Sequence, residues 1–378
     1  MRFSTKAIHA GQKPDPLSGA VMTPVYLTST YVQEELGKNK GYEYSRVNNP
    51  TRDALEANIA ALEGGNHGLA FGSGMAAIDS LFRLLKPGSQ VIVSQNVYGG
   101  TYRIGKMVWE DFGLTFEFID TTKLHLVQKA ITKQTRMIFV ETPTNPTMEI
   151  TDLAAIAEIA KKRKLISIAD NTFATPYLQK PLEYGFDAVV HSLTKYLNGH
   201  SDMIGGMIVT SNAGMTERLR FFQKATGGIL SPFDSWLCLR GTKTLTVRME
   251  QHGKSAMHVA EWLSKQKKIK EVYYPGLSYH PQYKLAKRQM KNFGGMISFD
   301  LGSLTAAKKF LKRVRLCALA ESLGGVETLI SHPATMTHAS IPPARRRAIG
   351  VTDGLVRISV GLEDVDDIID DLGQALRI

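Results

Sequence analysis

Lys195 is the residue whose position points most directly to covalent chemistry. It follows a short apolar segment, Ala188–His191, that is typical of a buried strand, and the hydroxyl residues Ser192 and Thr194 precede it. Burial at the end of a strand would lower the pKa of a lysine and leave its amine free to attack a carbonyl carbon. The two hydroxyls could hold an anion beside that amine. An amine next to an anion site is what a phosphorylated aldehyde requires.

A glycine-rich segment, Gly72–Ala77, follows one predicted strand and opens a predicted helix. Its G-x-G-x-x-A pattern also occurs in dinucleotide sites, where helix N–H groups face a phosphate. Such sites need an acidic residue about 20 positions later to hold the ribose, and Ser94 and Gln95 stand there instead. The segment therefore favours a site for a single phosphate over the nucleotide site of a dehydrogenase.

Asp170 directly follows the predicted strand Leu165–Ala169. One interpretation is a turn or helix cap, which suits many aspartates in this position. The other pairs its carboxylate with a pyridine nitrogen, which would stay protonated and let the ring withdraw electrons from a carbanion. The 25 positions between Asp170 and Lys195 leave room for one crossover to a strand that ends at the same edge. Together the two residues indicate one site.

Three more side chains are expected at this edge. Asn145 lies in the segment Glu141–Pro146, where two prolines would stiffen the loop after another strand. Tyr98 follows a predicted strand, and its ring would either stack on a planar ligand or simply pack. Arg357 stands among apolar residues, where it would pair with a protein carboxylate or clamp a substrate carboxylate.

The elements that must position these residues alternate between short apolar segments and amphipathic ones. This alternation predicts an α/β fold with a mainly parallel sheet of seven strands covered by helices on both faces. Ligands of such sheets gather at the carboxyl ends of the strands. We expect the strands at Gly68–Phe71, Gln90–Ser94, Thr115–Ile119, Met137–Glu141, Leu165–Ala169, Ala188–His191 and Met207–Thr210, and helices at Ala76–Leu85, Leu124–Ile131 and Leu153–Arg163.

The chain is expected to divide into an N-terminal arm (1–45), a large domain (46–232) and a smaller C-terminal α/β domain (233–378). A helix should begin at residues 49–52, capped by Thr51, and end at the glycine pair 64–65. The C-terminal part should open with one long helical region, Asp234–Lys265.

Composition excludes several function classes. The 378 residues are 43% hydrophobic and 21% charged, which is typical of a soluble globular protein. Residues 1–6 are not followed by the apolar segment of a secretion signal, so a cytoplasmic protein is expected. No apolar run is long enough to cross a membrane, and two cysteines, Cys238 and Cys317, are expected as buried thiols rather than a disulfide or metal site. The net charge of +11 falls largely on helical patterns without interleaved aromatic residues, so nucleic acid is not expected as a partner.

Many motifs resemble those of the cysteine/methionine-metabolism family of pyridoxal-phosphate enzymes, in order along nearly the whole chain. The resemblance implies pyridoxal 5'-phosphate as cofactor, an aspartate-aminotransferase-like fold of type I, and a homotetramer built as a dimer of active dimers. The matching segments are Tyr42–Arg46, Asn49–Arg52, Ser73–Ala77, Val97–Gly100, Glu141–Pro146, Asp170–Thr172, Ser192–Asp202, Ala320–Gly325, Met336–Ser340 and Ser359–Glu363.

The resemblance also implies residue roles. Lys195 would bond to the cofactor and later move protons, Asp170 would hold its ring nitrogen, and Tyr98 would stack on the ring and protonate the leaving thiol. The phosphate would be bound by Gly74, Met75, Ser192 and Thr194, with Tyr44 and Arg46 reaching it from a neighbouring subunit. The amino-acid substrate would contact Arg46, Tyr98, Arg103, Asn145, Glu321, Ser322 and Arg357.

Glu321 and Arg103 match positions that face the distal end of the substrate in family members that act on cystathionine. The methionine γ-lyases carry a cysteine at the position of Gly100 and an apolar residue at that of Glu321, and enterobacterial-type β-lyases carry an aromatic residue at the latter. The expected activity is therefore cleavage of cystathionine at its γ-carbon, with hydrogen sulfide from cysteine as a side reaction. Synthesis of cystathionine, cleavage at the β-carbon and an inactive cofactor-binding regulator remain alternatives.

Overall fold

The structure, a computed structural model, describes residues 1–377 and contains two β-sheets. In the larger sheet, one strand next to an edge runs antiparallel to both of its neighbours. All the other neighbouring strands pair in parallel. The prediction of a mainly parallel seven-stranded sheet is thus confirmed. Its strands lie in the order β1 (His67–Phe71), β7 (Gly206–Thr210), β6 (Ala188–Ser192), β5 (Ile166–Asp170), β4 (Thr135–Glu141), β2 (Gln90–Ser94) and β3 (Thr115–Ile119).

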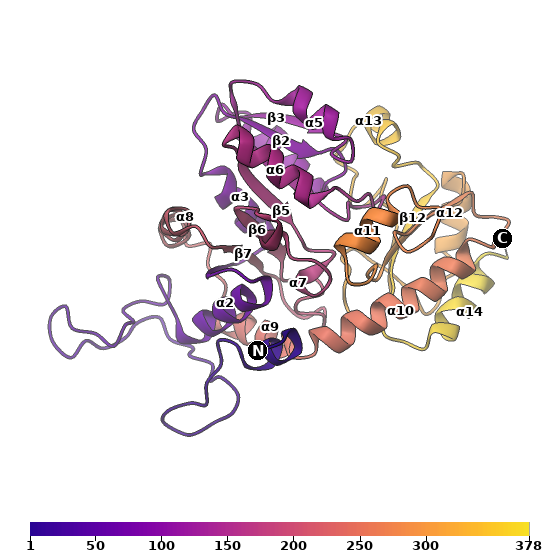
Figure 1. Cartoon of the computed structure of the whole chain (residues 1–378). Coiled ribbons are helices and arrows are strands. Elements are labelled where there is room, and N and C mark those ends of the chain that lie inside the picture. Colours follow the sequence, from indigo (N-terminus) through magenta and orange to yellow (C-terminus); the bar gives the residue numbers. More distant parts are fainter. Residues whose placement is uncertain (378) are drawn as a thin grey trace.

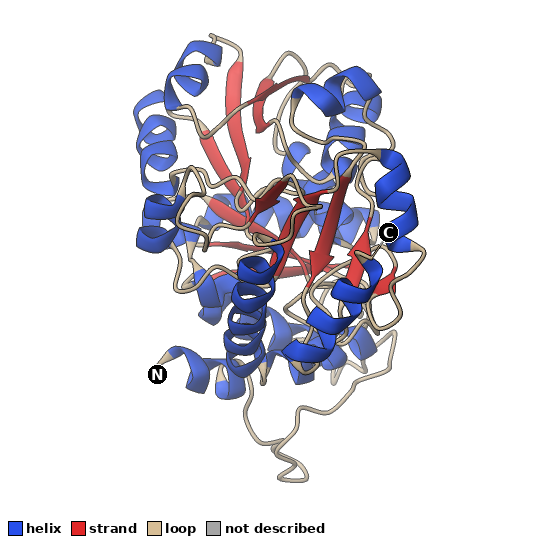
Figure 2. Cartoon of the chain, turned by 90° about the vertical axis from the view of Figure 1, so that its right-hand side faces the viewer, coloured by secondary structure: helices blue, strands red, loops and turns tan. Residues whose placement is uncertain are grey.

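Helices cover both faces of this sheet (Figure 1; Figure 2), because alternate side chains of each strand point to opposite faces. Val91 and Val93 pack with two helices on one face, whereas Ile92 packs with two others on the opposite face. Burial on both faces explains why these strands are almost continuously apolar. The first face carries α3 (Gly74–Phe82) and α8 (Ala213–Thr226), and the second carries α2 (Pro50–Glu63), α5 (Leu124–Ala130) and α6 (Leu153–Arg163).

The C-terminal part forms the second, mostly antiparallel sheet, which packs against helices on one side. Its strands lie in the order β10 (Ala318–Leu319), β11 (Leu329–Ser331), β12 (Leu355–Ser359), β9 (Met296–Asp300) and β8 (Glu271–Tyr273). The helices of this part are α10 (Leu245–Leu263), α11 (Tyr283–Gln289), α12 (Leu304–Leu311), α13 (Pro343–Ala348) and α14 (Val365–Ala375).

The N-terminal segment includes a short helix, α1 (Phe3–His9), which contacts α2 and α10. Beyond it the chain runs without regular helices or strands and extends away from the body as two long loops (Figure 1). Several apolar side chains of these loops are exposed, among them Leu17, Val32 and Leu36. This exposure fits the predicted arm, and its contact with a neighbouring subunit stays a prediction.

One local expectation is wrong. The cap of α2 is Asn49, whose side chain accepts from the Thr51 N–H, and the Thr51 hydroxyl instead donates to the Pro24 carbonyl. The predicted helical region 234–265 consists of two helices, α9 (Pro232–Thr242) and α10, separated by a short break, and α9 contacts α2 of the large sheet's layer. The break follows because the Gly241 carbonyl accepts from the Thr244 hydroxyl and from Arg248.

Four short elements complete the fold: α4 (Gly99–Ile104), the π-helical turn η1 (Gly105–Trp109), α7 (Thr175–Leu178) and the 3₁₀ turn η2 (Pro181–Tyr184). Cys238 and Cys317 are both buried free thiols, as predicted. Within residues 1–377, no helix combines the length and apolar character that crossing a membrane requires.

Candidate active site

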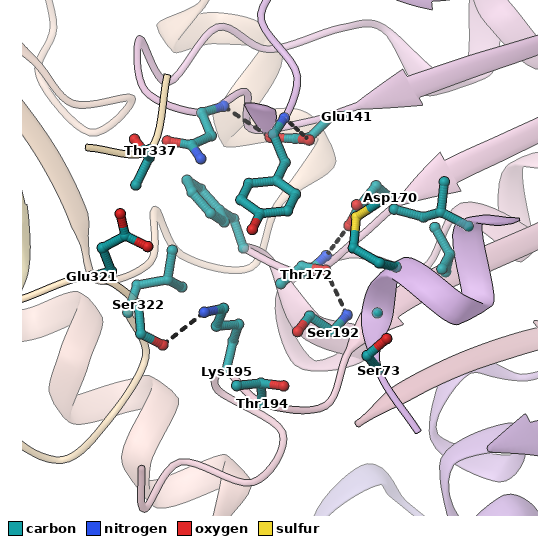
Figure 3. A pocket seen from close by; sticks show the side chains of 18 of the residues that line it. Ser73, Glu141, Asp170, Thr172, Ser192, Thr194, Lys195, Glu321, Ser322 and Thr337 are labelled. Atoms are coloured by element: carbon teal, nitrogen blue, oxygen red, sulfur yellow. Dashed lines mark hydrogen bonds between the residues drawn. The ribbon is translucent and has the colours of Figure 1, made fainter. Parts of the chain in front are cut away.

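A cavity of about 260 Å³ lies where β4, β5 and β6 end, and residues of the C-terminal part close its other side (Figure 3). This is the strand edge at which the sequence predicted a ligand site. The cavity brings together eleven of the predicted site residues: Gly74, Met75, Tyr98, Asn145, Asp170, Ser192, Thr194, Lys195, Glu321, Ser322 and Arg357.

Lys195 lies in the turn after β6, and its Nζ donates a hydrogen bond of 2.7 Å to Ser322 Oγ (Figure 3). Partial burial, with a contribution from the positive charge of Arg357, lowers the pKa of the Lys195 amine to about 8. Glu321 acts in the opposite direction. An amine with this pKa is partly unprotonated near neutral pH, as nucleophilic attack or proton removal requires.

Asp170 ends β5, next to β6 in a parallel pairing that aligns it with Val190. Its Oδ1 accepts from the Thr172 N–H at 3.0 Å, so the turn interpretation holds. The residue also lines the cavity although it is only 7% exposed, so the ligand interpretation fits the same position. Burial raises the pKa of the Asp170 carboxyl, and the bonds from Thr172 oppose that rise.

The end of the cavity near α3 has the chemistry of an anion site. Ser73 caps α3 by accepting from the Ala76 N–H at 3.0 Å, and Gly74 and Met75 occupy the first turn, whose N–H groups have no acceptor within the helix. A Cβ on Gly74 would lie 3.1 Å from Ser192 Cβ, so glycine keeps this end open. Backbone donors, hydroxyls and a nearby amine fit the phosphate and aldehyde of pyridoxal phosphate.

Hydrogen bonds hold the Thr194 hydroxyl and the backbone of Ser192 in place near Lys195. Thr194 Oγ1 accepts from the Gly205 N–H at 3.1 Å, which orients that hydroxyl. The Ser192 N–H donates to Thr172 Oγ1 at 2.9 Å, which ties the end of β6 to the turn after β5. Thr172 therefore supports both strand ends, a contact that no sequence pattern predicts.

Arg357, on β12, is 2% exposed and reaches the cavity from the C-terminal sheet. Its Nη1 donates to Asn145 Oδ1 and its Nη2 to the Ser322 carbonyl, both at 2.9 Å. The expected alternative of a paired protein carboxylate is wrong, because none lies within 4.0 Å of this guanidinium in residues 1–377. Burial lowers the pKa of Arg357 to about 10. A cation held by neutral acceptors keeps its charge available for an anionic ligand.

Three predicted residues lie outside the cavity of their own chain. The Arg46 guanidinium lies 5.5 Å from the centre of the Tyr44 ring and donates to the Lys224 carbonyl. Both residues are exposed, as is Arg103 on α4. Their predicted roles therefore stay predictions, and those of Tyr44 and Arg46 require a second subunit.

Several residues that line the cavity are not among the predicted site residues, including Ser73, Glu141, Thr172, Phe173 and Thr337. Glu141 stands at the end of β4, in register with Asp170, and a carboxylate at a strand end was a signal that could have identified it. Thr337 comes from a loop of the C-terminal part, and only the folding of that loop over the sheet edge brings it here.

Comparison with known proteins agrees with this geometry. Residues 4–377 match the model of the family described as Cys/Met metabolism PLP-dependent enzyme. Cystathionine beta-lyase of Coxiella burnetii is 56% identical over 99% of this chain and 97% of its own length. Cystathionine gamma-lyase of Bacillus subtilis is 51% identical over 100% of both chains.

Solved structures show the same fold. The crystal structure of metB from Corynebacterium glutamicum has a TM-score of 0.97 and 48% identity, covering 100% of this chain and 98% of its own. Cystathionine gamma-lyase from Lactobacillus plantarum, complexed with L-serine, has a TM-score of 0.96 and 46% identity, covering 99% and 98%. The predicted type I fold and the predicted cofactor, pyridoxal phosphate, are thereby confirmed. The chain belongs to the Cys/Met metabolism PLP-dependent enzyme family.

Proposed function

We propose that this chain is a cystathionine γ-lyase, which cleaves L-cystathionine to L-cysteine, 2-oxobutanoate and ammonia. The observation that carries the proposal is Glu321, an exposed carboxylate that lines the same cavity as the buried Arg357. Cystathionine has an amino-acid group at each end. Arg357 suits the carboxylate on the α-carbon at which the first proton is removed, and Glu321 suits the ammonium at the distal end.

The cofactor would be held by residues of three segments. Gly74 and Met75, with Ser192 and Thr194, would bind its phosphate, and Asp170 would accept a hydrogen bond from its ring nitrogen. When bound, pyridoxal phosphate supplies an electron-withdrawing ring that stabilises negative charge on the substrate carbons. The Asp170 carboxylate favours the protonated form of the ring nitrogen, on which that withdrawal depends.

Lys195 is proposed as the base that moves protons at the substrate. Its amine has a pKa near 8, so a substantial fraction is unprotonated at the pH of a cell interior. The Ser322 hydroxyl holds that amine at 2.7 Å and would orient it toward the α-carbon and then the β-carbon. Tyr98 lines the cavity, where its hydroxyl would donate a proton to the sulfur that leaves from the γ-carbon.

Cleavage at the β-carbon is the second candidate, because a relative with 56% identity over 99% of this chain is named cystathionine beta-lyase. The two reactions share the binding of both substrate ends and differ in the carbon from which sulfur leaves. Synthesis of cystathionine from an activated homoserine and cysteine would use the same cavity to form, rather than break, the bond between sulfur and the γ-carbon.

The products separate these activities. Purified enzyme with pyridoxal phosphate is incubated with L-cystathionine in one reaction and with O-acylhomoserine plus L-cysteine in a second, and the products of each are identified by mass spectrometry. The proposal predicts 2-oxobutanoate with cysteine. Pyruvate with homocysteine would replace it with β-cleavage, and net formation of cystathionine from O-acylhomoserine and cysteine, with no keto acid, would replace it with synthesis.

We also propose that the chain works as a homotetramer made of two active dimers, with residues 1–45 as the arm that contacts the neighbouring subunit. The exposed pair Tyr44 and Arg46 would then complete the phosphate site of that neighbour. Their absence from the cavity of their own chain supports this arrangement. Light scattering on the holoenzyme should give about four times the 41.7 kDa mass of one chain.

A further inference from the structure

Glu141 is a buried carboxylate with two backbone partners from different segments. It is 4% exposed at the end of β4, where it lines the cavity beside Asp170. Its Oε2 accepts from the Tyr98 N–H at 2.8 Å, and its Oε1 accepts from the Asn145 N–H at 3.0 Å (Figure 3). The loops after β2 and β4 are thus joined through one side chain.

The two partners belong to opposite parts of the site. Tyr98 begins α4 and has no side-chain cap of its own, so the Glu141 carboxylate is an acceptor at the start of that helix. Asn145 continues the contact, because its Oδ1 accepts from Arg357. Arg357 in turn donates to the carbonyl of Ser322, whose hydroxyl accepts from Lys195. A continuous chain of hydrogen bonds therefore runs from Tyr98 through Glu141 to Lys195.

Keeping a carboxylate in this place is unfavourable by itself. Burial and the nearby charge of Asp170 raise the pKa of Glu141 well above its usual range, and the two N–H bonds and Arg357 only partly oppose this rise. Buried ionisable groups are rarely retained without a partner that needs them. The two N–H groups are such partners, because each of them donates to its own oxygen of the Glu141 side chain.

We propose that Glu141 is a positioning residue that fixes Tyr98 and Asn145 relative to each other, and so aligns the ring-stacking side chain with the clamp on the substrate carboxylate. This inference rests on the roles proposed above for Tyr98, Asn145 and Arg357. Glu141 itself touches neither the reacting carbons nor the leaving sulfur in this account. Its effect is exerted through the two backbone N–H groups.

Glu141→Gln tests the claim, because glutamine has nearly the same shape but only one acceptor oxygen. Its amide NH₂ would oppose one of the two backbone N–H groups, and that loop would move. A buried N–H group left without an acceptor corresponds to roughly a 10- to 100-fold change. We expect two constants to rise, each by about this factor. One is the Kd of the apo-protein for pyridoxal phosphate, measured by absorbance titration, and the other is the KM for cystathionine.

Asp371→Asn is the matched control. Asp371 is also a buried carboxylate, 6% exposed, and it accepts from the backbone N–H groups of Arg315, Leu316 and Cys317, but it lies on α14 and outside the cavity. Its substitution should lower the Tm and leave the cofactor Kd and the KM unchanged. A purely structural Glu141 would behave in the same way.

Glu141→Asp covers the case in which the glutamine variant does not fold. Aspartate keeps the charge but is one methylene shorter, so it cannot reach both N–H groups, and the cofactor Kd and KM should rise here too. Wild-type Kd and KM in either folded variant, with only a lowered Tm, would overturn the inference. A wild-type protein that binds pyridoxal phosphate but does not cleave cystathionine would instead overturn the proposed function.

Discussion

The buried amine of Lys195 should lower the stability of the cofactor-free protein at neutral pH. The cavity lowers the pKa of its amine from 10.5 to about 8, which means that the folded state disfavours the ammonium form. Because the unfolded chain binds this proton more tightly, stability should rise with pH between about 8 and 10.5, and the full penalty should be present below pH 8. Replacing Lys195 with methionine, a side chain of similar size without charge, should remove that penalty.

The size of the effect follows from the shift. A difference of about 2.5 pKa units corresponds to about 3 kcal/mol, since each unit contributes about 1.4 kcal/mol. Loss of the hydrogen bond to Ser322 offsets about 1 kcal/mol of this. Lys195→Met should therefore stabilise the cofactor-free protein by about 2 kcal/mol at pH 7, and by close to zero near pH 9.5. In a chain of this length that corresponds to a rise in Tm of roughly 3 °C at pH 7.

Differential scanning fluorimetry of the cofactor-free protein between pH 6.5 and 9.5 measures the difference. Lys129→Met, at an exposed position on α5, is the control and should change the Tm little at any of these pH values. The variant at Lys195 should have no lyase activity in spite of its higher Tm. A lower Tm than wild type at pH 7, or a difference that does not change with pH, would refute the assignment of a desolvated amine at this position.

Three further substitutions test the assigned roles. Asp170→Asn should lower kcat by several orders of magnitude, because the ring nitrogen would lose the anion that keeps it protonated; steady-state rates at saturating cofactor measure this, and an undiminished kcat would remove Asp170 from its role. Glu321→Val should lower kcat/KM for cystathionine relative to shorter thiol amino acids, so an unchanged ratio would count against the distal contact. Arg357→Lys should raise the KM for cystathionine about tenfold or more, because an ammonium lacks the paired donors of a guanidinium; an unaltered KM would show that the substrate carboxylate binds elsewhere.

Much of the large sheet could be predicted because its strands are buried on both faces. Gln90–Ser94 is short and mostly apolar, and the structure has this strand with the predicted bounds. The edge strand Thr115–Ile119 also has its predicted bounds, although Thr115 and Glu117 are exposed. The break between α9 and α10 could not be predicted in this way, because it depends on Arg248 reaching back to the Gly241 carbonyl. Apolar periodicity continues through that break and carries no sign of the contact.

The site could be predicted where chemistry coincides with a strand end. Asp170 ends β5 and Lys195 comes shortly after β6, and parallel pairing of these strands brings the two residues to one edge without further information. The partners of Arg357 depend instead on how the two sheets meet, and β12 lies more than 200 positions after Asn145. The strand-end position of Glu141 is visible in the sequence, but its two contacts with backbone N–H groups depend on how the loops after β2 and β4 fold.

Lys195, the lysine of the cavity, is proposed as the group that binds the cofactor covalently. Reduction of the holoenzyme with sodium borohydride, followed by proteolysis and peptide mass spectrometry, tests this directly. We predict a phosphopyridoxyl mass on the peptide that contains Lys195, and no such mass in the Lys195→Met variant. Labelling of a different lysine, or a wild-type protein that carries the cofactor without any reducible link to Lys195, would contradict the account.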